Sequence, residues 1–264
     1  MCIRDSDRYG LASANSVSTP ANPNVKLCKD DKVSKPVDPV LYQSMVGSLL
    51  YVAIATRPDI SQAVGVVSKF NSCPTEAHFT AVKRILCYLK GTLDVTLKYK
   101  KTEDGQLVGF SDANYAGDPD DRHSTSGNVF LMSSGPISWY SKKQAIVTLS
   151  TAEAEYVALS TATQEIVWIR RLLSDLTATQ GQATVLMEDN QGAICIAKNP
   201  VLHVRTKHID VCYRYVREAV NDGVINLQYC RTHEMVADIL TKPLPKQRFE
   251  TLRTNMGLTK STTC

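Results

Sequence analysis

The stretch Val108–Arg122 constrains the fold most, because it has the pattern of an apolar strand that carries a carboxylate. Val108, Phe110 and Asp112 alternate along one side of this strand, and we take that side as the inward one. The opposite side carries Leu107, Gly109 and Ser111. An ionised Asp that is buried alone costs several kcal/mol. Asp112 is therefore expected to have a partner or a bound cation.

Composition narrows the class of protein. The 264 residues are 43% hydrophobic and 21% charged, as in an ordinary globular protein, and the net charge of +4 permits a polyanionic partner without requiring one. Eight scattered cysteines without a Cys-x-x-Cys motif indicate a reducing compartment. No apolar run reaches the ~18 residues of a membrane helix, and no secretory signal is apparent. We therefore expect an intracellular protein without a membrane partner.

Hydrophobic spacing predicts two kinds of structure in succession. Residues 1–38 are rich in Ser, Asn, Pro and Lys and are expected to be an extended or disordered lead-in. The helical spacing of apolar residues over 39–92 predicts a small, mostly helical segment, with a helical hairpin followed by a third helix. Strands and helices then alternate, which predicts an α/β fold with a mixed sheet. The expected strands are 93–101, 106–112, 127–133, 137–142, 184–190 and 224–230.

A second inward carboxylate is predicted on the long helix after residue 150. Ser150 and Glu153 have the spacing of a capping box, which gives Glu153 a structural role. Helical steps from Glu155 instead reach an apolar, core-facing stripe. That stripe is Leu159, Ala162, Ile166, Ile169 and Leu173. The alternative for Glu155 is a buried side chain satisfied by an Arg or by the backbone.

Two further acids follow later strands. The strand that begins at Thr184 ends in Glu188 and Asp189, and ligand sites of open α/β sheets gather at such carboxyl ends. We prefer Asp189, with Glu188 as the close competitor and helix capping as the alternative role. Asp238 opens a short helix five positions after His233. Alone, an Asp at that position is usually a partner of the helix dipole or a surface residue.

The order Asp112, Glu155, Asp189 and Asp238 resembles a ribonuclease H domain, specifically the one that ends the polyprotein of copia-type (Pseudoviridae) retrotransposons. The resemblance implies a ribonuclease H-like fold over residues 93–258, with a mixed five-stranded sheet and helices on both faces, and a tail at 259–264. The motifs that carry it lie between residues 106 and 258. They are Gly109–Gly117, Ser138–Gln144, Leu149–Tyr156, Glu188–Asn190, Thr206–Asp210, Tyr215–Glu218 and Ala237–Pro243.

The front of the chain resembles the part of the same polyprotein that follows the polymerase active site. The resemblance implies that residues 39–92 are a helical remnant of the thumb or connection region of a reverse transcriptase. The aspartate pair of the polymerase is expected upstream and is absent, so no polymerase activity is expected. The matching motifs are Ser18–Pro20, Val46–Tyr51, Thr56–Ile60 and Val82–Thr92.

Four converging carboxylates cannot all be ionised unless divalent cations bind them. Their hard oxygen ligands select Mg²⁺, for which Mn²⁺ can substitute, over zinc. Two such ions would activate a water on one side of a phosphodiester and stabilise the leaving oxygen on the other. The resemblance implies the substrate, the RNA strand of an RNA·DNA hybrid. His233 resembles the mobile histidine that assists product departure in related nucleases, and a plain surface histidine is its alternative.

Four cations are candidates for contacts with the nucleic-acid backbone, because phosphates are neutralised by Lys and Arg. Each of them fits a solvated surface equally well. The resemblance implies two partners, the RNA·DNA hybrid and the reverse transcriptase portion of the same polyprotein. It also implies a cytoplasmic location, including virus-like particles, or a nuclear one. The four cations are Arg122, Lys142, Lys143 and Lys207.

Two rival functions use the same residues differently. A catalytically silent, connection-like domain would only hold the hybrid or pack on a polymerase, and the four acids in place argue against it. A transposase or integrase nuclease of similar fold would carry its acids in the order Asp, Asp, Glu. This chain has the order Asp, Glu, Asp, Asp.

Overall fold

The computed structural model describes residue 9 and residues 13–29, 33–101, 105–198 and 207–261, with the backbone alone for 207–211. The chain divides into two compact units. The first comprises residues 1–98, 119–121 and 242–264, and the second comprises residues 99–118 and 122–241. The boundaries predicted at residues 38, 92 and 258 follow sequence motifs rather than compactness, and they stay a prediction.

The first unit is mostly helical, as its hydrophobic spacing indicates. Asp38 caps its first helix, because the side chain accepts a hydrogen bond from the Val40 N–H. His78 is fully buried in the third helix and stacks on Phe70 with 3.8 Å between ring centroids. The helices are α2 (Pro39–Ala55), the 3₁₀ helix η1 (Pro58–Ile60), α3 (Ser61–Ser68), α4 (Glu76–Lys90) and α9 (Lys246–Asn255).

A small sheet in the first unit corrects one expectation. The strand predicted over residues 93–101 is only β1 (Val95–Leu97). It pairs antiparallel with β7 (Leu258–Lys260). Alternation along a segment indicates a strand but carries no information about its partner. In the sequence, the whole of the second unit lies between these two strands.

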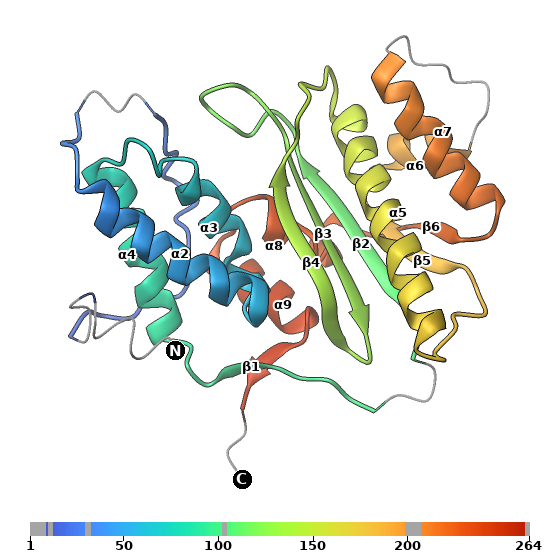
Figure 1. The fold of residues 1–264 in the computed structure, drawn as a ribbon, viewed down its shortest axis with the longest axis horizontal. Helices are drawn as coiled ribbons and strands as arrows, with labels where there is room; N and C mark the ends of the chain where they lie inside the picture. Colours follow the sequence, from blue (N-terminus) through green and yellow to red (C-terminus); the bar gives the residue numbers. More distant parts are fainter. Residues whose placement is uncertain (1–8, 10–12, 30–32, 102–104, 199–206, 262–264) are drawn as a thin grey trace. The chain divides into compact units, whose positions relative to one another are not determined.

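The second unit contains the predicted mixed sheet of five strands (Figure 1). Their order across the sheet is β4-β3-β2-β5-β6. Strands β2, β3 and β4 form an antiparallel meander, whereas β5 runs parallel to β2 and β6 runs parallel to β5. The strands are β2 (Val108–Asn114), β3 (Thr125–Met132), β4 (Gly135–Lys143), β5 (Thr184–Glu188) and β6 (Ile225–Tyr229).

Helices cover both faces of this sheet. The Asn128 amide donates to the Ala158 carbonyl of α5, and a Cβ on the preceding Gly127 would meet Leu240 and Thr241 of α8. Successive residues of a strand point to opposite faces, so α5 and α8 lie on opposite sides. The ribonuclease H-like fold is therefore confirmed. The helices are α5 (Thr151–Asp175), α6 (Gln191–Lys198), α7 (Lys207–Asn221), α8 (Asp238–Thr241) and the 3₁₀ helix η2 (Thr232–Glu234).

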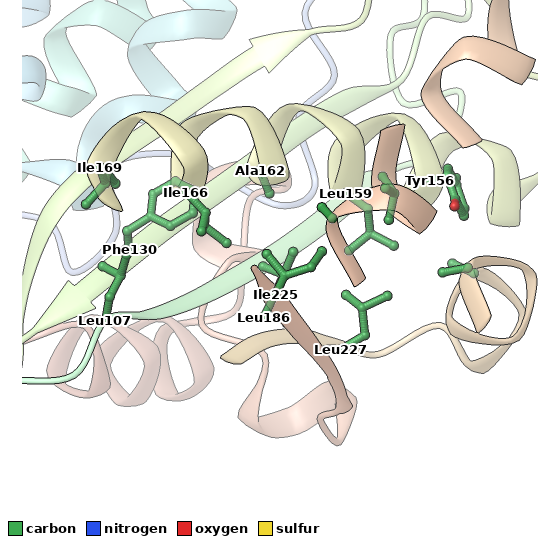
Figure 2. Close-up of a cluster of buried hydrophobic side chains, with 14 of the residues drawn as sticks. Leu107, Phe130, Tyr156, Leu159, Ala162, Ile166, Ile169, Leu186, Ile225 and Leu227 are labelled. Carbon is green, nitrogen blue, oxygen red and sulfur yellow. The ribbon is translucent and has the colours of Figure 1, made fainter. Parts of the chain in front are cut away.

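The main hydrophobic core of the second unit lies between α5 and the sheet (Figure 2). All five residues of the stripe predicted after Glu155 are buried in it. One expectation about β2 was wrong: Leu107, rather than Val108 and Phe110, faces this core. Asp112 is nevertheless buried, because the opposite face of β2 is covered by α8. Among the helices of the described residues, none is long and apolar enough to cross a membrane.

Candidate active site

Strands β2 and β5 separate where the acids lie. Their parallel pairing ends at Phe110 and Met187, but β2 continues for four more residues. Asp112 lies in this extension, and Asp189 directly follows β5. Because the carboxyl ends of parallel strands meet at one edge of a sheet, the two acids converge. Asp112 is 2% exposed, and Asp189 is half-buried.

Helix α5 brings a third acid to the same place. Ser150 caps the helix by accepting the Glu153 N–H at 3.2 Å, while the Glu153 carboxylate accepts the Leu149 N–H. Glu153 thus has the structural role predicted for it. Glu155 is 7% exposed, and its carboxylate accepts a hydrogen bond from the Ala113 N–H of β2. The predicted inward direction of Glu155 is confirmed.

Small side chains allow α5 to approach the strand closely enough for this contact. Three buried alanines, Ala113 of β2 and Ala154 and Ala158 of α5, form a separate apolar cluster. Alanine has no atoms beyond Cβ, so the helix and strand backbones come near each other where these side chains meet. The Glu155 side chain can therefore reach the β2 backbone.

Asp112, Glu155 and Asp189 form a group that fits a metal ion. Each offers one carboxylate oxygen, and the three oxygens lie within 4.8 Å of one another. Opposite ligands of an octahedral Mg²⁺ lie about 4.2 Å apart, twice the metal–oxygen distance of ~2.1 Å. Glu155 Oε2 is buried without a hydrogen-bond partner among the described residues. Such an atom and an all-carboxylate donor set suit a hard divalent cation.

The electrostatics of the cluster are those of crowded acids. The pKa of Glu155 is raised to about 11, first because burial disfavours the charged form and then because Glu188, Asp112 and Asp189 repel a further negative charge. The hydrogen bond from the Ala113 N–H acts in the opposite direction and lowers this pKa. Without a cation, burial and the neighbouring acids therefore both favour the protonated form of Glu155.

Glu188, the close competitor of Asp189, is fully buried beside the cluster. Its Oε1 accepts the Asn190 N–H at 3.0 Å, and its Oε2 has no hydrogen-bond partner in the described part of the chain. Burial raises the pKa of Glu188 well above its ordinary value; the Asn190 N–H lowers it, and the charges of Asp112 and Asp189 raise it further. Asp189, and not Glu188, belongs to the group of three, but the choice of ligand stays a prediction.

Asp238 lies beside this group, not within it. It is fully buried at the start of α8. On the same helix, the Thr241 hydroxyl donates to the Asp112 carboxylate and lies 3.2 Å from the Asp238 carbonyl oxygen. Burial raises the pKa of the neighbouring Cys230 to about 11, with Glu234, Asp189, Asp238 and Glu188 adding to the rise. Asp238 thus lies in the same region as Asp189 and Glu188.

His233 lies in η2, which follows β6. Its side chain is 70% exposed, and its Nε2 is 3.6 Å from the Glu234 carboxylate. An exposed position is compatible with a mobile residue and equally with a plain surface histidine. Its role in product departure stays a prediction.

The four candidate phosphate contacts differ in their surroundings. Lys143 forms an ion pair of 2.8 Å with Asp118, whose side chain is 1% exposed. Lys142 and Arg122 are exposed, and Arg122 has a positive φ of 60° in the loop between β2 and β3. The Lys207 side chain lies outside the described residues. Lys143 therefore has a structural partner that its sequence context did not indicate.

Two residues that position the site were missed by sequence reasoning. The Gln144 amide donates to the Ala154 carbonyl at 2.8 Å and to Ser126 Oγ at 2.9 Å, which fixes the start of α5 against the sheet. The other is Thr241. The available signals were a Gln that ends a strand-like segment and a Thr three residues after Asp238, on the same face of a helix.

The sequence matches no family model, but it has close relatives. It is 42% identical over 259 residues to the retrovirus-related Pol polyprotein from transposon TNT 1-94 of Nicotiana tabacum, covering 96% of this chain and 19% of that protein. It is 41% identical over 253 residues to the Pol polyprotein from transposon RE1 of Arabidopsis thaliana, covering 96% of this chain and 17% of that protein.

Among solved structures, the chain is similar to the N-terminal ribonuclease H domain of a Mycobacterium tuberculosis protein, with a TM-score of 0.40 and 14% identity, covering 56% of this chain and 96% of that one. The chain spans less than a fifth of the two Pol polyproteins it matches. The sequence match nevertheless extends over nearly all of the chain. The chain is therefore related over nearly all of its length to one part of the Pol polyproteins of copia-type retrotransposons.

Proposed function

We propose that the second unit is a ribonuclease H that hydrolyses the RNA strand of RNA·DNA hybrids with two divalent ions. The observation that carries this proposal is the convergence of Asp112, Glu155 and Asp189, whose carboxylate oxygens lie within 4.8 Å of one another. They come from a strand, a helix and a loop that are far apart in sequence. A buried group of acids of this kind is strongly unfavourable without cations.

The acids would hold Mg²⁺, or Mn²⁺ in its place, with Asp238 completing the set. When bound, the ions supply an activated water and stabilise charge on the leaving oxygen. The chain positions the ligands: β2 directs Asp112, the Ala113 N–H orients Glu155, and Gln144 holds the helix that carries Glu155. Since Asp112 and Glu155 lie on a strand and a helix, little reorganisation of these two ligands is needed at the moment of reaction.

Other residues would serve the substrate. Lys142, Arg122 and Lys207 would contact phosphates, and Lys143 would do so beside its ion pair with Asp118. His233 would assist departure of the product. The reverse transcriptase part of the polyprotein would deliver the hybrid. We accordingly expect the activity in the cytoplasm, within particles, or in the nucleus.

The test is cleavage by the purified chain of three labelled substrates: an RNA·DNA hybrid, duplex RNA and duplex DNA. Each is incubated in Mg²⁺ and in EDTA. We expect cutting of the hybrid's RNA strand alone, in Mg²⁺ alone. Asp112→Asn and Asp189→Asn are expected to lower the rate by more than the 10–100-fold that is typical when a residue behind the ligands is lost.

Asp175→Asn is the matched control, because Asp175 is an exposed acid at the far end of α5 and should leave cleavage unchanged. A folded chain that binds hybrid but never cuts it in Mg²⁺ or Mn²⁺ would exclude the nuclease. The catalytically silent binding domain would then replace it. Cleavage that survives in both Asn variants would instead move the site elsewhere.

A further inference from the structure

Helix α8 packs against Gly127, which has no side chain, beside the group formed by Asp112, Glu155 and Asp189. Gly127 of β3 is the direct cross-strand partner of Asp112, so a side chain at residue 127 would point to the same face as Asp112. A Cβ placed there would lie 2.6 Å from Thr241 Cγ2 and 2.8 Å from Leu240 Cβ, closer than packed carbon atoms approach. Only glycine therefore admits α8 at this depth.

The close approach brings one hydroxyl to the cluster. Thr241 is 1% exposed, and its Oγ1 donates a hydrogen bond to Asp112 Oδ2. The same oxygen lies 3.2 Å from the Asp238 carbonyl oxygen, but a hydroxyl has one proton, and a carboxylate is the stronger acceptor. A donor fixed on one oxygen restricts rotation of the Asp112 carboxylate.

We propose that Thr241 is a positioning residue, which holds the Asp112 carboxylate in the orientation that binds the divalent cation, and that Gly127 exists to let it reach that carboxylate. This inference rests on the proposed function in one respect, that Asp112 binds the ion. It adds that α8 contributes to the site through Thr241 as well as through Asp238. Asp112 and Thr241 then act as one unit on the metal.

The test is Mn²⁺ binding to the folded full chain without nucleic acid, measured by electron paramagnetic resonance, together with the Mg²⁺ concentration for half-maximal hybrid cleavage. Thr241→Val keeps the volume and removes the donor, so the dissociation constant for Mn²⁺ and the Mg²⁺ concentration for half-maximal cleavage should each rise about tenfold. Thr241→Ser keeps the donor and should stay within about a factor of 3 of the wild type. Gly127→Ala, which displaces α8, should resemble the valine variant.

Two controls separate positioning from stability. Thr163→Val removes a fully buried hydroxyl that, within the described part of the chain, bonds only to the Leu159 carbonyl of α5, and metal binding should not change. In an Asp112→Asn background, Thr241→Val should have no further effect on residual Mn²⁺ binding, because the two residues act through one contact. If the valine variant does not fold, Thr241→Ala takes its place in both comparisons.

Wild-type Mn²⁺ affinity in the folded valine or alanine variant would overturn the proposal, and so would an undiminished effect of Thr241→Val in the Asp112→Asn background. These outcomes are distinct from a failure of the nuclease function. If the nuclease function alone is wrong, the wild type binds Mn²⁺ but cuts no hybrid, and Thr241→Val still weakens Mn²⁺ binding.

Discussion

Each compact unit buries a group of charged side chains, and the two groups are balanced differently. In the first unit, Arg57 is 5% exposed and forms two hydrogen bonds of 2.8 and 2.9 Å with Asp59, which is 1% exposed. Tyr88 donates to the same carboxylate at 2.5 Å, and Arg253 of α9 donates to the Tyr88 hydroxyl at 3.0 Å. In this group, Arg57 and Asp59 are opposite charges, and hydrogen bonds connect Tyr88 to Asp59 and Arg253 to Tyr88.

In the second unit, the charges that act on Glu155 are those of other acids. Burial alone would lower the pKa of Arg57. The charge of Asp59 and its hydrogen bonds, together with Tyr88, outweigh burial and raise this pKa, so the ion pair of the first unit persists. For Glu155, burial and the neighbouring charges all favour the neutral acid. The contrast teaches that a buried charge beside its counter-charge is structural, whereas a buried acid such as Glu155, on which the charges of other described acids act, indicates a ligand.

The largest effect on stability is expected when the buried ion pair of Arg57 and Asp59 is broken. Asp59→Asn leaves the buried Arg57 without its counter-charge, and the free energy of unfolding should fall by about 3–5 kcal/mol. Urea unfolding followed by circular dichroism measures it. Asp94→Asn breaks an exposed ion pair with Lys260 in the same unit and should cost no more than about 1 kcal/mol. Equal losses in the two variants would remove the distinction between the groups.

A gain in the free energy of unfolding is expected when one acid is removed from the group of Asp112, Glu155 and Asp189. Glu155→Gln removes an acid that crowding disfavours, so the metal-free chain should become more stable by roughly 0.5–2 kcal/mol at pH 8, with cleavage lost. Because the pKa of Glu155 is higher in the folded chain, at about 11, than its ordinary 4.5, its folded-state proton favours folding below pH 4.5. That stabilisation declines as the pH rises through the interval between these values.

Melting temperatures in EDTA between pH 5 and pH 9 check this sign. They should fall with pH in the wild type and fall less in Glu155→Gln, whereas Glu218→Gln, an exposed acid of α7, should behave as the wild type. Mg²⁺ should raise the wild-type value more at high pH, since the ligands bind metal when deprotonated. A wild-type profile that is flat in EDTA would contradict the crowding of the acids.

The smallest effect separates an exposed cation from a paired one. Lys142→Ala should weaken hybrid binding a few-fold and reduce the slope of log affinity against log salt by about 1, as expected for one lost phosphate contact. Its stability should stay within about 0.5 kcal/mol of the wild type. Lys143→Ala should mainly lower stability, since it removes the partner of the buried Asp118. Fluorescence anisotropy at several salt concentrations, with thermal melting, distinguishes the two.

Local periodicity predicted most of the candidate site. Alternation along β2 placed Asp112 on a strand face, and helical spacing placed Glu155 on the buried stripe of α5. Both inferences need only neighbouring residues, since each side chain's direction follows from its own element. The mixed sheet followed from the same patterns, because strands that alternate with helices require parallel connections.

What sequence reasoning missed depends on contacts between distant elements. Alternation cannot say which face of β2 meets the larger core, so Leu107 and Phe110 were exchanged. It also cannot predict that Lys143 pairs with Asp118, because the loop between β2 and β3 turns through positive φ values at Ala116 and Arg122. The hydroxyl of Thr241 became significant only once α8 was seen against Gly127.

The pairing of β1 with β7 has a consequence for the order in which the chain acquires structure. A ribosome that has finished β1 must still make the entire second unit, and then α9, before the partner strand emerges. The second unit lies wholly within that interval, so it can fold during synthesis while the first unit waits for its last strand and for Arg253. A chain terminated after α8 would carry every acid of the candidate site, yet it would leave the earlier helices unfinished.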